Sequence, residues 1–167
     1  MPSKTQSILV AAVVGAVLSV LTQFLASSGG GVQYVGSALG CISIIAVPLI
    51  AVWHYTNTHR LTLNAGSGAG LGAMASIASG LLGYIIAFGL QAVGVLPTQE
   101  EIIAAQREDL LSQGLTAEQI DQAMGFATAM TGPVGIIVGL VIAAVVGAIV
   151  GAIGASVFKK GTADDEV

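Results

Sequence analysis

The stretch from Val134 to Phe158 reads VGIIVGLVIAAVVGAIVGAIGASVF and contains no charged residue. Ser156 is its only polar side chain. The hydrocarbon core of a bilayer is about 30 Å thick and a helix rises about 1.5 Å per residue, so roughly 20 apolar residues are enough to cross it. This stretch therefore predicts a membrane-spanning helix.

Three further stretches are long and apolar enough to span a membrane: residues 7–26, 32–55 and 71–95. A backbone in lipid must satisfy its hydrogen bonds within its own segment, so each stretch is expected to be a helix. The predicted fold is all-α, an integral membrane four-helix bundle in which residues 1–167 form a single membrane domain. Pro48 is expected to kink the second span, because its missing amide removes one helical hydrogen bond.

The composition agrees with this fold. Hydrophobic residues make up 54% of the chain, charged residues only 8%, and the mean hydropathy is +0.90. Soluble domains carry about 25% charged residues, so a soluble enzyme is disfavoured. The hydrophobicity excludes a disordered chain, and the single Cys41 excludes a disulfide scaffold. The expected partner is the lipid bilayer, and no nucleic acid is expected.

Basic residues predict the orientation of the spans. Four of the five bases lie at span ends that would share one side of the membrane: Lys4, Arg60, Lys159 and Lys160. The positive-inside rule places both termini and the loop between spans two and three in the cytoplasm, with residues 159–167 as a cytoplasmic tail. An alternative for the first span is a cleaved secretory signal, because Lys4 precedes it and the small residues 26–28 follow it.

Residues 98–131, between spans three and four, form an acidic external segment. The segment holds six acids and one base, Arg107, for a net charge of −5. The acids are Glu100, Glu101, Glu108, Asp109, Glu118 and Asp121. Such a segment is a solvated cap, an interaction surface for a partner, or an acidic vestibule that concentrates cations.

Helix-start signals divide this acidic segment into two. Thr98 and Glu101 fit a capping box, in which each side chain bonds the backbone amide of the other residue. Residues 116–119 fit a second capping box, and Gly114 between them is typical of the residue that follows a helix. We therefore expect a short amphipathic helical hairpin between spans three and four, on the outer face of the bundle.

Small residues recur at every fourth position of the fourth span. The row comprises Gly135, Gly139, Ala143, Gly147, Gly151 and Ala155, and the second span carries Gly36 and Gly40 at the same spacing. Small residues at this spacing let helix backbones approach closely. The row is interpreted as packing within the bundle, with self-association through the fourth span or a glycine-zipper pore as alternatives. Glycines at 66–72 lack the βαβ context of a nucleotide site, so they predict a close-packed or flexible start of span three.

Polar residues within the spans are few and uncharged. The absence of Asp, Glu, Lys and Arg at depth argues against an ion-coupled transporter with a buried carboxylate and against most intramembrane hydrolases. The polar groups at depth are Gln23, Ser37, Cys41, Ser43, Ser76, Ser79, Tyr84 and Gln91. Such side chains usually bond their own helix or a neighbour, so a structural role is expected. Cys41 is expected to be a buried small hydrophobe.

Aromatic and basic residues gather at the predicted membrane interface. They are Trp53, His54, Tyr55, His59 and Arg60 after the second span, and Lys159 and Lys160 after the fourth. Because Trp and Tyr favour the interface and Arg the headgroups, these residues are interpreted as anchors. His54 and His59 are five residues apart, about 140° around a helix, so one metal ion would not take both. We predict no catalytic, cofactor-binding or metal-binding residue.

The sequence of residues 111–120, LSQGLTAEQI, resembles a family of small bacterial inner-membrane proteins, the domain of unknown function forty-one ninety-nine. Members of that family are similar in length, have four spans, and place an acidic helical segment between spans three and four. The similarity extends to the small-residue fourth span that ends in Phe158-Lys159-Lys160. The resemblance implies this topology and a location in a bacterial inner membrane, and it implies no activity or catalytic residue.

The leading functional hypothesis is a non-enzymatic accessory or structural subunit that packs with itself, as a homo-oligomer, or with another membrane protein. It rests on the small-residue faces and on the lack of ionisable groups at depth. The alternative is a small oligomeric channel or permease with the six acids at an external mouth. An intramembrane enzyme or redox protein that uses His54 and His59 is a third class.

Overall fold

The computed structural model of the chain describes residues 3–28, 31–129 and 133–161, with the side chains of 126–129 and Pro133 excepted. Within this part the regular elements are six α-helices. They are α1 (Thr5–Ser27), α2 (Val32–His59), α3 (Ala65–Ala92), α4 (Gln99–Ser112), α5 (Ala117–Ala129) and α6 (Pro133–Val157). The predicted all-α fold is confirmed. Residues 162–167 of the predicted tail lie outside the described residues.

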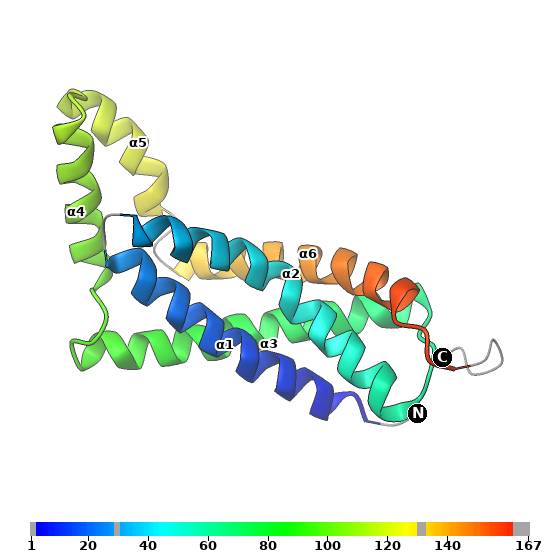
Figure 1. Cartoon of the computed structure of the whole chain (residues 1–167). Helices are drawn as coiled ribbons and strands as arrows, with labels where there is room; N and C mark the ends of the chain where they lie inside the picture. The colour runs from blue at the N-terminus through cyan, green and yellow to red at the C-terminus, as the bar shows by residue number, and fades with distance from the viewer. Residues whose placement is uncertain (1–2, 29–30, 130–132, 162–167) are drawn as a thin grey trace.

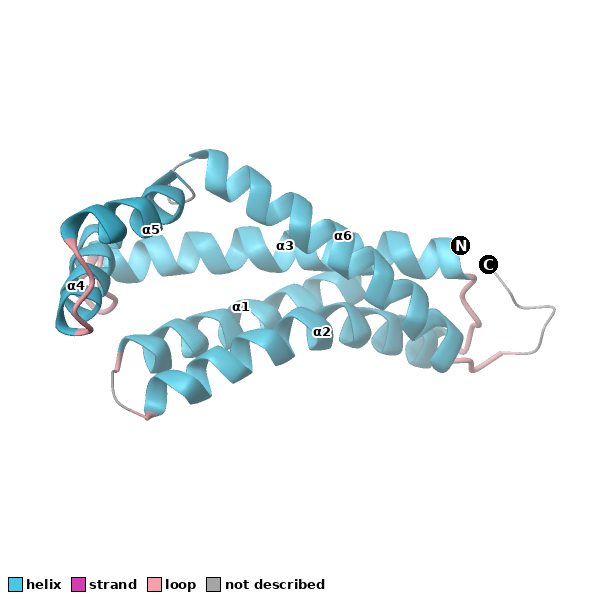
Figure 2. Cartoon of the chain, turned by 90° about the horizontal axis from the view of Figure 1, so that it is seen from above, coloured by secondary structure: helices cyan, strands magenta, loops and turns pink. Residues whose placement is uncertain are grey.

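Four of the helices, α1, α2, α3 and α6, are long and apolar enough to cross a membrane, as predicted. They run side by side as an up-down bundle, and α4 and α5 lie beyond one of its ends (Figure 1). Within the bundle α1 packs between α2 and α3, and α6 packs mainly against α3. Figure 2 shows α1 and α2 diverging from α3 and α6 toward the end that carries α4.

The most extensive contact in the bundle joins α3 to α6, and it runs through glycines. A Cβ added at Gly68 would lie 2.6 Å from the carbonyl oxygen of Gly151, and one added at Gly147 would lie 2.7 Å from that of Gly72. No side chain has room there, so the two backbones touch. In lipid, where burial supplies no hydrophobic drive between helices, such contact gains dispersion energy and weak hydrogen bonds from Cα atoms.

Larger side chains separate α3 from α6 toward the other end. A Cβ on Gly80 would lie 3.2 Å from Cδ2 of Leu140. At Gly80 a leucine side chain therefore lies against α3, whereas at Gly72, two turns earlier, the backbone of α6 does. α6 also meets α2, where Leu49 and Val52 lie against Gly154. The four spans therefore converge at the end where α6 finishes and are spread apart at the end where it begins.

The start of α3 differs from the predicted third span, 71–95, because α3 begins at Ala65 and ends at Ala92. The side chain of Asn64 caps the helix by accepting a hydrogen bond from the Ser67 amide at 2.7 Å. Glycine weakens an isolated helix by about 1 kcal/mol relative to alanine. The close packing of this glycine-rich turn on α6 offsets that cost, so the segment is helical.

The core lies at the convergent end. Its buried members come from α1, α2, α3, the α2–α3 connection and α6: Ala11, Val47, Ala51, Val52, Tyr55, Leu63, Leu71, Ala75 and Ala155. Thr62 of the connection exchanges hydrogen bonds of 3.1 and 3.2 Å with the backbone of Gly161, which ties the loop to the segment after α6. The core and this tie close the bundle at that end.

The predicted helix caps in the acidic segment are confirmed. The Thr98 amide donates to Oε2 of Glu101 at 2.7 Å, and the Glu101 amide donates to Oγ1 of Thr98 at 3.3 Å. Thr116 and Gln119 make the same reciprocal pair at the start of α5. Gly114 follows α4 with a φ of 83°, a conformation that glycine adopts without strain.

The glycine contact predicts opposite effects of alanine at two neighbouring positions of α3. Gly72→Ala places a methyl group 2.9 Å from Cα of Gly151 and closer still to the Gly147 carbonyl, so overpacking should cost about 1–3 kcal/mol and lower the midpoint of thermal unfolding. Gly70→Ala meets no atom within 4 Å and should keep or raise the midpoint, because alanine favours a helix. Thermal unfolding in one detergent compares the two variants, and equal midpoints would contradict the contact.

Candidate functional site

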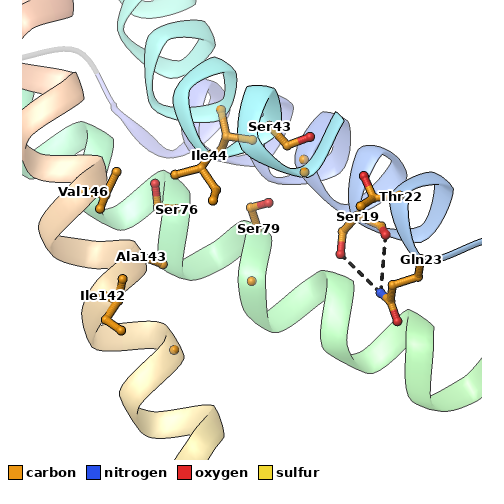
Figure 3. A pocket seen from close by; sticks show the side chains of 15 residues that line it. Ser19, Thr22, Gln23, Ser43, Ile44, Ser76, Ser79, Ile142, Ala143 and Val146 are labelled. Atoms are coloured by element: carbon orange, nitrogen blue, oxygen red, sulfur yellow. Dashed lines mark hydrogen bonds between the residues drawn. The ribbon is translucent and has the colours of Figure 1, made fainter. Parts of the chain in front are cut away.

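A cavity of about 410 Å³ lies between the four long helices, in the half where they are spread apart (Figure 3). Each of the four contributes part of its wall. The lining residues are Gly15, Ser19, Thr22, Gln23, Gly40, Ser43, Ile44, Val47, Ser76, Ser79, Gly80, Gly139, Ile142, Ala143 and Val146. We call this space the inner cavity. Its wall is mostly apolar and carries several hydroxyl groups but no charged side chain.

The hydroxyl groups of the inner cavity are bonded unequally. Ser43 donates to the carbonyl oxygen of Leu39 one turn earlier at 2.7 Å, as serine in a membrane helix usually does. The Ser19 hydroxyl accepts a hydrogen bond from the side-chain Nε2 of Gln23 at 3.4 Å, drawn in Figure 3. In the described part of the chain, the hydroxyls of Ser76 and Ser79 make no hydrogen bond. Both oxygens instead lie against glycines of neighbouring helices, that of Ser76 against Gly147 of α6 and that of Ser79 against Gly15 of α1.

Two residues of this wall stand out, because Ser79 is largely buried and the hydroxyl of Thr22 is both buried and unpaired. Ser79 is only 8% exposed, and Figure 3 draws its hydroxyl on the side of α3 that faces α1 and α2. The hydroxyl oxygen of Thr22 is buried and has no hydrogen-bond partner among the described residues. A buried polar group without a partner costs about 1–3 kcal/mol, so a ligand that bonds to it recovers free energy.

A second cavity of about 530 Å³ adjoins the first beneath α4, and we call it the outer cavity. It is lined by Gln23, Ala26, Ser27, Gln33, Pro97, Glu101, Ile102, Ala105, Gln106 and Asp109. Gln23 lines both cavities, so its side chain marks the place where they meet. Two carboxylates thus stand outside a neutral, hydroxyl-bearing interior.

The six predicted surface acids separate into two groups. Glu101 and Asp109 line the outer cavity, whereas Glu100, Glu108, Glu118 and Asp121 do not. Asp121 of α5 pairs with Arg107 of α4 at 2.7 Å, with both side chains largely exposed. An exposed pair of this kind contributes about 0–1 kcal/mol, so it joins the two helices only weakly. Among the described residues, neither Glu101 nor Asp109 forms an ion pair.

Hydrogen bonds keep Glu101 ionised. The backbone amide of Thr98 and then its hydroxyl both donate to the Glu101 carboxylate, and they lower the pKa of Glu101 below its usual 4.5. The charged form accepts these bonds and the neutral form accepts them poorly. The outer cavity therefore keeps this negative charge throughout the neutral and mildly acidic range.

The predicted packing residues are used unevenly. Gly147, Gly151 and Ala155 are buried, and Gly68 and Gly72 of α3 fill the space in front of them. Gly36 and Gly40 of α2 pack against α1, where Thr22 is their shared neighbour. Of the remaining row, Gly139 and Ala143 line the inner cavity, and Gly135 is half-buried.

The predicted interface anchors also fall into two sets. Trp53 is 46% exposed, while Tyr55, predicted to lie at the membrane interface, is 1% exposed within the core and has its ring edge-on to His59 at 4.9 Å. Nδ1 of His54 lies 2.9 Å from the Ser7 hydroxyl and joins α2 to α1. Three consecutive helical residues point about 100° apart, so they could not all face lipid. Arg60, Lys159 and Lys160 are exposed.

Cys41 corrects an expectation, because its side chain is exposed on α2 and was predicted to be buried. In a bundle of four spans each helix turns much of its apolar surface to lipid, so a small hydrophobe need not face the core. The described residues include no group of three or more metal-ligating side chains. His54 bonds to Ser7 and His59 packs on Tyr55, which gives both histidines a structural contact.

Sequence reasoning missed the two cavities and the unpaired hydroxyls. Every polar group at depth was expected to be satisfied, and Ser37 and Ser43 do bond their own helix. Ser76 and Ser79 lie three residues apart on α3, at a spacing that puts them on one face. That spacing is the one signal in the sequence, and it is too common to identify a cavity.

A scan against models of known protein families finds no match, and searches of curated proteins and of solved structures find none either. The chain is therefore placed by its fold alone, as a helical protein with four segments able to cross a membrane.

The lowered pKa of Glu101 predicts a measurable titration at the Thr98 amide. Because the folded state favours the carboxylate, the cap is fully present at neutral pH and is lost as the pH falls through the lowered pKa, below 4.5. In detergent micelles, the NMR shift of the Thr98 amide proton should change with a midpoint below 4.5. Glu101→Gln should abolish this transition, and a midpoint at or above 4.5 would contradict the cap.

Proposed function

We propose that this protein is a small multi-pass membrane protein of the permease type, which binds a solute in the inner cavity and admits it through the outer cavity. The observation that carries the proposal is a cavity between four candidate spans whose wall includes the Ser79 hydroxyl and the buried, unpaired Thr22 hydroxyl. A purely structural bundle would avoid the cost of the unpaired Thr22 hydroxyl with an apolar residue at that position.

The two ends of the inner cavity support a one-sided site. Toward the convergent end, the cavity stops at Gly15 and Val47, and the buried core begins with Ala11 and Ala51. Toward the other end, it meets the outer cavity at Gln23. A solute would therefore enter and leave from the α4 end, while the core blocks the opposite end.

Charge supports an orientation for this site. Lys4, Arg60, Lys159 and Lys160 belong to the convergent end, whereas the acids of α4 and α5 belong to the other (Figure 1). The positive-inside rule then puts the convergent end in the cytoplasm and the cavities on the outer side of a bacterial inner membrane. In this orientation both termini are cytoplasmic.

Cysteine labelling tests whether the inner cavity holds water and from which side. In a Cys41→Ala background, Ser43→Cys should react with a membrane-impermeant, positively charged methanethiosulfonate added outside intact cells, because a thiol ionises only where water reaches it. Ile45→Cys, two residues away on α2 and exposed to lipid, is the control and should react at least about tenfold more slowly.

The same labelling experiment reports orientation. Thr58→Cys, at the convergent end of α2, should react only after the membrane is opened. Equal rates at positions 43 and 45 would show that the inner cavity is not an aqueous site and would remove the permease proposal. Labelling at position 58 from outside would reverse the orientation.

A second candidate, the accessory or structural subunit, is favoured by the surface of α6. This helix is the least buried of the four candidate spans. Its exposed face carries β-branched side chains at every fourth position: Ile137, Val141, Val145, Ile149 and Ile153. Gly147 and Gly151 of the small-residue row are already covered by α3. A partner helix would therefore use the β-branched face.

Crosslinking decides for or against the accessory subunit. In the Cys41→Ala background, Val145→Cys should give disulfide-linked dimers or a crosslinked partner in native membranes, and Leu81→Cys, exposed on α3, serves as the control. Native mass in mild detergent should then exceed that of one chain. A monomeric mass together with no crosslink at position 145 would exclude this candidate.

A further inference from the structure

We propose that the solute of this site is a single-chain lipid. Its hydrocarbon chain enters the inner cavity sideways from the bilayer, through a gap between α2 and α6, while its polar head stays at the junction with the outer cavity. This inference rests on the proposed function and names its substrate class. It is based on the contacts between neighbouring spans, which close three sides of the inner cavity and leave the fourth side open.

Three pairs of neighbouring helices are in contact alongside the inner cavity. A Cβ added at Gly40 of α2 would lie 3.3 Å from Cγ2 of Thr22 of α1. One added at Gly83 of α3 would lie 3.2 Å from Oγ of Ser19, also of α1, and Leu140 of α6 lies against α3 at a similar depth. The cavity is therefore closed between α1 and α2, between α1 and α3, and between α3 and α6.

The fourth pair, α2 and α6, separates before it reaches the cavity. Gly154 of α6 lies against α2 at the convergent end, but a Cβ added at Gly139, which lines the inner cavity, would meet no described atom within 4 Å. Ile44 of α2 and Ile142 of α6 also line the cavity and are 55% and 58% exposed (Figure 3). Because the wall of an enclosed cavity would be buried, the inner cavity opens sideways between these two helices.

The inner cavity has nearly the depth of one leaflet of a bilayer. Gln23 marks its junction with the outer cavity and Gly15 its far end, and these residues are about two turns apart on α1. A helix rises about 1.5 Å per residue, so the cavity is roughly 12 Å deep, against about 15 Å for half of the hydrocarbon core. In the proposed orientation, the gap between α2 and α6 therefore faces the lipid chains of the outer leaflet.

The chemistry of the two cavities suits the two parts of a lipid. The inner wall is mostly apolar, with residues such as Val47 and Val146, and among the described residues no charged side chain lines it. Atoms around an empty apolar space lack neighbours on one side, and a hydrocarbon chain that fills the space restores those dispersion contacts. The side-chain amides of Gln23, Gln33 and Gln106 line the outer cavity and can bond the polar head there.

The depth of the inner cavity predicts the length of the chain. Carbon–carbon bonds of about 1.5 Å at an angle of about 111° advance an extended chain by about 1.25 Å per carbon. A cavity roughly 12 Å deep therefore holds a chain of about ten carbons. A shorter chain would leave the deep end of the cavity empty.

Photolabelling of the purified full-length chain in lipid nanodiscs tests this assignment. The probe is 1-decanoylglycerol with a diazirine at the end of its chain, which on illumination inserts into the residue that it touches, and mass spectrometry locates the adduct. Adducts are expected at the deep end of the inner cavity, at Gly15, Val47 or Val146. An excess of unlabelled 1-decanoylglycerol should reduce these adducts at least about tenfold by competition for one site.

A hexanoyl probe with the same diazirine measures how the chain lies. Its chain is four carbons shorter, so its end should react about 5 Å nearer the junction with the outer cavity. Adducts are then expected at Ser19, Ser43 or Ala143, about one turn from the deep end on their helices. This comparison uses the parent chain and needs no substitution.

A matched pair of variants on α6 tests the cavity itself. Ala143→Phe should reduce the deep decanoyl adducts about tenfold, because the ring occupies space in the cavity that Ala143 lines. Val145→Phe, two residues away and exposed to lipid, should be labelled as the parent chain is. The midpoint of thermal unfolding in the same nanodiscs shows that both variants are folded.

Two results would overturn the lipid assignment. One is adducts confined to lipid-facing residues and unaffected by the competitor, and the other is the same adduct depth for both probes. If either is found while Ser43→Cys is still labelled from outside, the site remains a solute cavity and only the lipid class fails. If the deep adducts are found but Ser43→Cys is not labelled, the chain binds in a cavity that water does not reach, and the permease proposal fails.

Discussion

The contact of backbone against backbone between α3 and α6 determines the shape of this molecule. Gly68 and Gly72 meet Gly147 and Gly151 where no side chain fits, so the two helices are drawn together at one end only. Toward the other end Leu140 lies between them and keeps them apart. Because helices are stiff, a contact at one end and a wedge at the other produce a cavity rather than a uniformly packed bundle.

The cavity changes the role of ordinary side chains. Serine in a membrane helix commonly bonds its own backbone, as Ser43 does, and then has little capacity for a ligand. Ser79 lines the same cavity but makes no such bond among the described residues, and its hydroxyl oxygen lies against Gly15 of α1. Pro48 adds to this asymmetry, because it lacks the amide that would bond the carbonyl of Ile44, a residue of the cavity wall.

Local features were predicted well because they depend on neighbours in the chain. The capping pair of Thr98 and Glu101, the turn at Gly114 and the four apolar segments each follow from residues within a few positions. The burial of Tyr55, the exposure of Cys41 and the early start of α3 were not predicted. Each of these depends on which helix face meets another helix, and a nearly uniform apolar sequence does not distinguish its faces.

The sequence by itself determined that the chain forms apolar helices of membrane-spanning length with acids gathered in one segment, because length, hydropathy and charge are properties of the linear chain. Only the tertiary structure decided that Gly147 and Gly151 pack against α3, while Gly139, in the same row, faces a cavity. It also decided that, of the six acids, only Asp109 and Glu101 line the outer cavity. These outcomes depend on side-chain sizes matched between helices that are far apart in the chain, and periodicity within one helix carries no information about its partner.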